Sequence, residues 1–116
     1  MDASLPKTER LSGKTALARL LDGGRWGSTA HLKYCWLAGE GPVNRLLVSV
    51  PKKFFKRAVR RNLLKRRLRE SYRLQKGLLT GTGIDLMIAY NSPEVLPFDV
   101  IFGEVAEILG KIFSKL

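Results

Sequence analysis

The sequence has one cysteine, one histidine and no long apolar run in its 116 residues. The single cysteine, Cys35, excludes an internal disulfide and fits a reducing compartment. We expect its thiol to be buried, because a cysteine nucleophile would need a base positioned beside it. No stretch of about 18 apolar residues is present, so no membrane-spanning helix is expected. The first residues lack the charged and apolar regions of a signal peptide, and we therefore expect a cytoplasmic protein.

Residue patterns typical of catalysis are also missing. A protein nuclease needs clustered carboxylates that hold metal ions, or a pair of histidines for acid–base work. His31 has no partner, Asp85 has no second acid close in sequence, and Glu104 and Glu107 are expected on the solvent side of a helix. No glycine-rich phosphate loop or cysteine cluster occurs. We expect no catalytic residue, no metal site and no cofactor bound by a dedicated site of the chain.

Acidic residues are scarce where basic residues are densest. Between Lys52 and Lys76 the chain carries twelve Lys or Arg residues, and Glu70 is the one acid. The rest of the chain is balanced in charge, although the whole chain has a net charge of +11. A positive field confined to one segment of a small protein points to a polyanion as the partner, with nucleic acid as the leading candidate.

The length indicates one domain over residues 1–116, with residues 1–10 expected to be loose. Its apolar fraction of 45% is that of a folded globule. Apolar spacing and turn residues predict helices over 14–22, capped by Ser12, over 56–75, and from Phe98 towards the end. Strands are expected at 31–38, 44–50 and 84–90, the first two as a hairpin, with a weakly signalled strand at 25–30. The order α-β-β-(β)-α-β-α favours an α+β fold, a two-layer α/β sandwich.

The basic segment separates into two faces when it is placed on a helix at about 100° per residue. The apolar side, expected to pack on the sheet, contains Leu63, Leu64, Leu68, Tyr72 and Leu74. The opposite arc contains Asn62, Lys65, Arg66, Arg69 and Arg73, with Arg61 at its border and Arg60 beside the apolar side. Solvated surfaces usually mix charges of both signs, and this arc does not. We therefore interpret it as a phosphate-binding surface, since guanidinium groups grip two oxygens at once.

Two alternatives remain at this level. The amide of Asn62 suits a directional hydrogen bond to a ligand, but it could instead bind the backbone of its own helix. The whole segment could also be a basic amphipathic helix lying on a membrane surface. The strands on either side argue against the membrane interpretation, because the apolar side is needed for the core.

A motif in this region resembles the protein subunit of bacterial ribonuclease P. It reads Ser49-Val-Pro-Lys-Lys53 and then Arg61-Asn62-x-x-Lys65-Arg66-x-x-Arg69-Glu70. The resemblance implies a ribonucleoprotein in which the RNA subunit, with Mg²⁺ in its active site, removes the 5′ leader of precursor tRNA. The protein would bind the catalytic RNA and the leader, and would be inactive alone. It also implies an α/β sandwich with a left-handed βαβ crossover, although general rules predict the opposite hand.

The resemblance assigns an RNA-binding role to Lys52, Lys53, Arg61, Asn62, Lys65, Arg66 and Arg69. We add Arg60 and Arg73 to this set. Leu63 stands where the family often has a further arginine. Leu17 and Leu21 stand where the first helix of the family often carries two aromatic residues that face the leader, so they are candidates for a leader cleft. Because leucine cannot stack on a base as an aromatic ring can, Tyr34 and Trp36 are added as further candidates. The expected partners are the catalytic RNA and precursor tRNA, with no membrane and no obligate protein partner. The alternative is a structural RNA-binding protein of another ribonucleoprotein, such as the ribosome.

Overall fold

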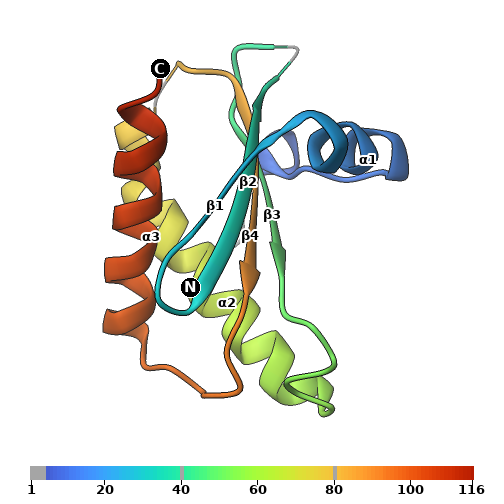
Figure 1. The fold of residues 1–116 in the computed structure, drawn as a ribbon, viewed down its shortest axis with the longest axis vertical. Helices are drawn as coiled ribbons and strands as arrows, with labels where there is room; N and C mark the ends of the chain where they lie inside the picture. Colours follow the sequence, from blue (N-terminus) through green and yellow to red (C-terminus); the bar gives the residue numbers. More distant parts are fainter. Residues whose placement is uncertain (1–4, 40, 80) are drawn as a thin grey trace.

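The computed structural model describes residues 5–39, 41–79 and 81–116 of the chain. Four strands form one sheet in the order β1-β2-β4-β3, and three α-helices pack on its two faces (Figure 1). The strands are β1 (Arg25–Ser28), β2 (Leu32–Ala38), β3 (Arg45–Ser49) and β4 (Ile84–Tyr90), and the α-helices are α1 (Lys14–Gly23), α2 (Ala58–Gln75) and α3 (Phe98–Phe113). The mixed α+β class and the weakly signalled strand at β1 are confirmed. Short 3-10 turns at Lys7–Glu9 and Lys76–Leu79 precede α1 and follow α2.

The expected hairpin between residues 31–38 and 44–50 is wrong. β4 lies between these two segments, antiparallel to β2 and parallel to β3, and the hairpin of the sheet is β1–β2. The reason is visible in the burial of β4, where six of its seven residues are buried. A strand that apolar is most stable in the middle of a sheet that is covered on both faces. The central position therefore goes to β4, although it comes last in the sequence.

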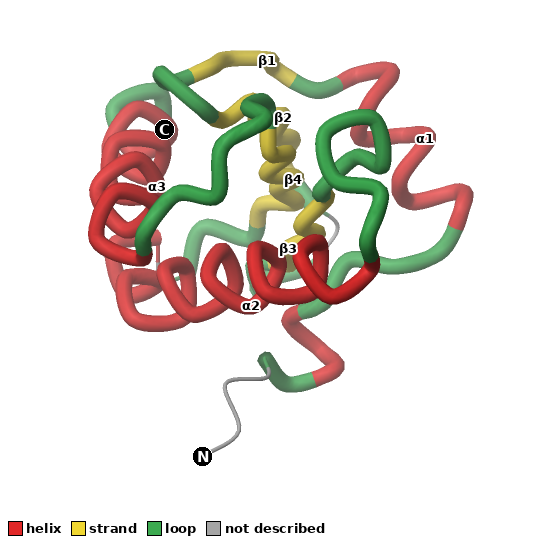
Figure 2. The backbone as a smooth tube through the Cα atoms, turned by 90° about the horizontal axis from the view of Figure 1, so that it is seen from below, coloured by secondary structure: helices red, strands yellow, loops and turns green. Residues whose placement is uncertain are grey.

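The parallel strands β3 and β4 are joined through α2, which makes a βαβ unit. Seen from the side of α2 with both strands pointing upward, β4 lies to the left of β3 (Figures 1 and 2). The crossover is therefore left-handed, as the family resemblance implied and against the general preference.

The main core lies between the sheet and the two long helices α2 and α3. Leu64, Leu68 and Tyr72 of α2 are at most 1% exposed and join the large apolar cluster there. Two other residues of the expected apolar side, Leu63 and Leu74, are 36% and 55% exposed. The prediction was wrong for them because the buried stripe of α2 is narrower than the broad apolar arc of its sequence.

Helix α1 adds a partial third layer on the opposite face of the sheet (Figure 2). Its Leu20 packs with Cys35 and Met87 in a second, smaller core. The buried Cys35 thiol is confirmed, and burial raises its pKa, which disfavours the reactive thiolate. The expected cap Ser12 is wrong by one position, since Gly13 is the N-cap residue and makes no side-chain capping bond.

Residues 5–10, part of the segment 1–10 that we expected to be loose, are attached to the body of the protein at several points. Leu5 is 2% exposed and belongs to the main core, and Arg10 forms a parallel bridge with Leu46. The carboxylate of Glu9 forms a salt bridge of 2.7 Å with the ammonium group of Lys76 at the end of α2. The buried side chain of Leu5 therefore anchors this segment. Residues 1–4 of the same expectation lie outside the described part.

Glu104 is buried at 9% exposure, so its expected position on the solvent side of α3 is wrong. Its carboxylate accepts hydrogen bonds from the Thr29 hydroxyl at 2.5 Å and from the His31 backbone N–H at 2.9 Å. The ring Nδ1 of His31 lies 2.6 Å from the second carboxylate oxygen. The lone histidine and this acid therefore join the β1–β2 connection to α3, a structural use that their sequence positions do not reveal. Glu107 is exposed, as expected.

Candidate RNA interface

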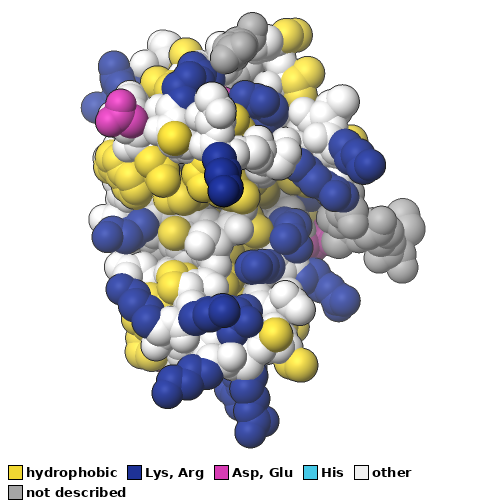
Figure 3. All heavy atoms as spheres, turned by 90° about the vertical axis from the view of Figure 1, so that its right-hand side faces the viewer, with side chains coloured by type: hydrophobic (Ala, Val, Ile, Leu, Met, Phe, Trp, Pro, Cys, Tyr) yellow, Lys and Arg dark blue, Asp and Glu magenta, His cyan; other side chains and the backbone are white. Residues whose placement is uncertain are grey.

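The exposed side of α2 carries a group of polar and basic side chains that we call the basic ridge, formed by Asn62, Lys65, Arg66 and Arg69. Asn62, Arg66 and Arg69 are exposed and Lys65 is half-buried, while Leu64 and Leu68 point into the core. The helical periodicity that buries the leucines therefore turns the ridge towards solvent. Figure 3 shows a face of the molecule on which Lys and Arg far outnumber acidic side chains.

The loop before α2 is fixed by Phe55, which is 5% exposed and packs edge-on against the ring of Tyr90 at a centroid distance of 5.7 Å. This anchor leaves Lys52 and Lys53 exposed in the turn after β3, in which the Phe54 N–H donates to the carbonyl of Pro51. The ammonium group of Lys53 lies 5.0 Å from the centre of the Phe54 ring. The two lysines are thus held next to the N-terminal end of α2.

Two of the expected RNA-binding arginines make contacts within the protein. Arg61 donates to the carbonyls of Phe55 and Lys56 at 2.8 and 2.7 Å, and so holds the preceding loop against α2. Arg73 pairs with Glu70 one turn earlier in the helix. These two guanidinium groups are partly occupied, which makes them weaker candidates for phosphate contacts than the basic ridge.

Within the described part of the chain, the ridge side chains make no hydrogen bond or ion pair with the protein, and the same holds for Lys52 and Arg60. Asn62 is therefore not bound to its own backbone, the alternative considered for it. A set of unpaired cations on a rigid helix is costly for an isolated domain, because like charges at i, i+4 spacing repel. Such an arrangement is typical of a surface that neutralises phosphates.

The structure does not bring the four expected leader-cleft residues together. Leu17 is half-buried and Leu21 is 38% exposed, both on α1. Tyr34 and Trp36 are 7% and 8% exposed and point into the main core on the opposite face of the sheet. Side chains alternate along β2, so the face of the sheet under α1 carries Lys33, Cys35 and Leu37. The sequence of β2 hid this because apolar and aromatic residues occupy both of its faces.

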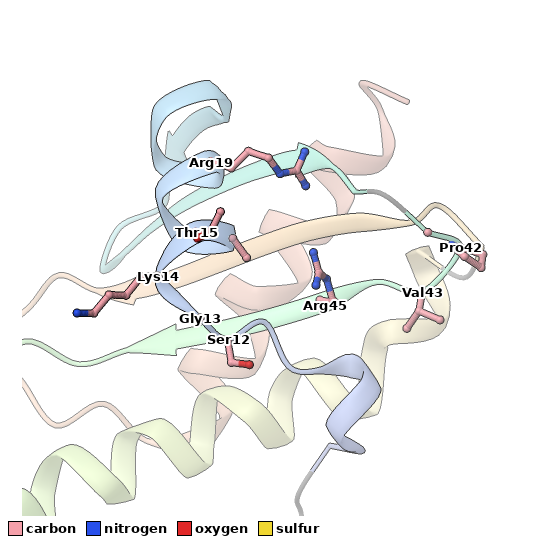
Figure 4. Close-up of a pocket in the computed structure, with 10 residues that line it drawn as sticks. Ser12, Gly13, Lys14, Thr15, Arg19, Pro42, Val43 and Arg45 are labelled. Atoms are coloured by element: carbon pink, nitrogen blue, oxygen red, sulfur yellow. The ribbon is translucent and has the colours of Figure 1, made fainter.

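Helix α1 forms two hollows with the neighbouring elements. An apolar cavity of about 230 Å³ lies between its first turn and β3, lined by Leu11, Leu17 and Leu47 among others. A larger pocket of about 630 Å³ lies near residues 41–43 and contains Arg19 and Arg45 in its wall (Figure 4). Both guanidinium groups reach the buried carboxylate of Asp85, at 3.1 Å from Arg19 and at 2.8 Å from Arg45. Asp85 is thus a structural acid.

Among the described residues, no group of three or more His, Cys, Asp or Glu side chains could hold a metal ion. No helix of the described part is long and apolar enough to cross a bilayer.

A family model described as Ribonuclease P matches residues 5–113 of the chain. The chain belongs to the ribonuclease P protein family. It is 34% identical over 113 residues to the ribonuclease P protein component of Geobacter sp. (strain M21), with 97% of this chain and 96% of that protein covered. The component from Desulforapulum autotrophicum is also 34% identical, with 97% and 92% covered.

Solved structures of ribonuclease P proteins have the same fold. The protein from Thermotoga maritima superposes with a TM-score of 0.79 at 23% identity, covering 89% of this chain and 96% of that one. The protein from Staphylococcus aureus superposes with a TM-score of 0.81 at 22% identity, covering 91% and 96%. The chain is thus an RNA-binding component of ribonuclease P, an endoribonuclease of tRNA processing in which the RNA subunit carries out catalysis. Family membership implies association with ribonuclease P RNA and decides against the ribosomal alternative.

Proposed function

We propose that the basic ridge, together with Lys52, Lys53 and Arg60, is the surface by which this chain binds the catalytic RNA. The observation that carries the proposal is the state of the ridge side chains, which are turned to solvent and make no contact with protein acids in the described part. A rigid helix presents these groups at fixed spacing, so a phosphate backbone can be bound without ordering flexible loops. Phosphate contacts of this kind position the protein on RNA, largely independently of base sequence.

The substrate of the assembled enzyme is, in this proposal, precursor tRNA, whose unpaired 5′ leader lies over the sheet face next to α1. The apolar cavity beside Leu17 and Leu47 offers room for a base or ribose. The Mg²⁺ ions are held by the RNA, and the protein supports them through its effect on RNA and substrate binding. The assembly acts in the cytoplasm, where newly made tRNA precursors need trimming.

The test is reconstitution of the enzyme at low magnesium concentration, with the cognate RNA subunit, a precursor tRNA and the purified protein. The expected result is 5′-leader removal in the complete mixture and none with the protein alone. The Arg66→Ala/Arg69→Ala double variant should need a higher protein concentration for the same rate. A matched control is Lys7→Ala/Lys115→Ala, which removes the same charge from exposed positions outside α2.

Two results would contradict the proposal. Cleavage of precursor tRNA by the protein without RNA would show that the chain itself is catalytic. Equal loss of function in the ridge variant and in the control variant would mean that net charge, rather than the ridge, determines assembly.

A further inference from the structure

One aromatic side chain on the sheet is exposed without an evident structural reason. Among the described aromatic residues, Trp26, Phe98 and Phe113 are 55%, 36% and 62% exposed, while the others are buried or half-buried. Phe98 and Phe113 are on α3, so Trp26 is the exposed aromatic of the sheet. It lies on the short edge strand β1, which directly follows α1 in the chain.

The strand register gives the face on which Trp26 lies. It pairs with Cys35, which packs under α1, so the indole is on the α1 side of the sheet. Trp26, Cys35, Met87 and Leu47 are paired across the four strands and form one row on this side of the sheet. The next row on the same side consists of Ser28, Lys33, Ala89 and Ser49. Lys33 is exposed and Ala89 and Ser49 are half-buried, whereas Cys35 and Met87 of the previous row are buried. Helix α1 therefore covers this row only in part, and the row presents small side chains and one lysine, with the indole near its edge.

The charge around this row is suited to an anionic strand. Ser49 is followed after two residues by Lys52 and Lys53, so the row connects Lys33 with the basic residues before α2. The nearest acid in sequence to Trp26 is Asp22, which is exposed in the last turn of α1. A single strand that crosses the row would meet cations near its phosphates and an indole beside its bases.

We infer that Trp26 is a stacking site for an unpaired base of a single-stranded RNA that crosses the α1 side of the sheet. The inference rests on the proposed function and adds a specific residue to it. Proteins that bind single strands combine such aromatic surfaces with basic grooves, because every base has a face that can stack. The bases of a duplex are stacked on each other and are not available to the indole. The site therefore distinguishes unpaired RNA from paired RNA.

The test uses tryptophan fluorescence of the full chain titrated with a short single-stranded oligoadenylate. Trp26 is the indole that a ligand can reach, since Trp36 is 8% exposed in the core. We expect quenching by the single strand, little quenching by a duplex, and no quenching in Trp26→Ala. Affinity for the single strand should fall by about 5- to 150-fold in Trp26→Ala, as for one lost stacked base, and much less in Trp26→Phe. Phe113→Ala, which removes an exposed aromatic from α3, should bind like the wild type.

Association with the catalytic RNA, measured in parallel, separates this inference from the proposed function. If Trp26→Ala retains that association but binds the single strand as well as the wild type, the stacking site is wrong and the proposed function stands. If the wild-type chain does not bind the catalytic RNA, the proposed function itself fails. A Trp26→Ala variant that loses self-association of the chain but no RNA affinity would show that the indole is a protein contact and would overturn the inference.

Discussion

The guanidinium group of Arg45 forms a two-pronged pair with the carboxylate of Asp85, with both contacts at 2.8 Å. Asp85 is 1% exposed, and Arg19 reaches it from α1 at 3.1 Å. The carboxylate therefore ties together β4, its parallel neighbour β3 and the helix on the other layer. This link is structural, because both oxygens of the Asp85 carboxylate accept hydrogen bonds from arginines.

The first prediction concerns this link. Asp85→Ala should lower the free energy of unfolding by about 3 kcal/mol, because breaking a buried pair leaves the partner cations without compensation. The measurement is urea unfolding followed by circular dichroism. Asp22→Ala removes an exposed acid and should stay within about 0.5 kcal/mol of the wild type. A fully stable Asp85→Ala variant would show that the arginines can turn to solvent without loss.

The second prediction concerns acid stability. Burial raises the pKa of the Glu104 carboxyl, but hydrogen bonds from Thr29 and His31 outweigh this effect, so the pKa lies below its ordinary value of 4.5. A group with a lower pKa in the folded state adds stability above its unfolded-state value and loses it as the pH falls through the folded-state pKa. Unfolding by urea should therefore become easier between pH 6 and pH 3 (about the range of this titration), and Glu104→Gln should weaken that dependence.

The exposed acid of the same helix provides the control for this experiment. Glu107 pairs with Lys111 on the surface of α3. Glu107→Gln should keep the acid sensitivity of the wild type, because exposed pairs contribute little. An identical pH profile for Glu104→Gln and the wild type would mean that other carboxylates are responsible for the acid sensitivity.

The third prediction separates two leucines of α2 that look equivalent in the sequence. Leu68 is fully buried, and Leu68→Ala should lower the free energy of unfolding by roughly 2–5 kcal/mol. Leu74 is 55% exposed, and Leu74→Ala should change it by no more than about 0.5 kcal/mol. Thermal or urea unfolding of the two variants checks this directly. Similar losses for both would place Leu74 in the core, contrary to the structure.

These two leucines also show what could be predicted from the sequence and what could not. Helical periodicity separates the basic ridge from Leu64 and Leu68, because one face of a long helix must be buried. The edge of the buried stripe depends on where α3 and the sheet make contact, and periodicity does not contain that information. The same limit applies to β2, whose apolar residues on both sides concealed that Tyr34 faces away from α1.

Long-range pairing was the other limit. The segments 31–38 and 44–50 are neighbours in sequence, and a short turn between two strands usually means a hairpin. The insertion of β4 between them is decided by the burial of residues far along the chain, which local patterns do not report. Trp26 could not be assigned to a face for a related reason, since its strand is four residues long and mostly exposed and so has no clear apolar alternation.

The fourth prediction distinguishes ridge arginines from structural arginines by the salt dependence of RNA binding. Each phosphate contact that is lost should reduce the slope of log K against log salt by about one unit. Arg66→Ala and Arg69→Ala should each show this change, measured by filter binding or fluorescence anisotropy with the catalytic RNA. An unchanged slope would mean that these side chains face water in the complex.

The last prediction applies the same measurement to Arg61, which the sequence motif places among the RNA-binding residues. Its guanidinium group donates to the carbonyls of Phe55 and Lys56, so Arg61→Ala should release the loop that holds Lys52 and Lys53. The free energy of unfolding should fall by about 1 kcal/mol, the usual net contribution of an intramolecular hydrogen bond. The salt slope should change less than in Arg66→Ala, because the group already has protein partners. A full one-unit loss of slope with unchanged stability would instead show that Arg61 leaves these carbonyls to bind phosphate when RNA is present.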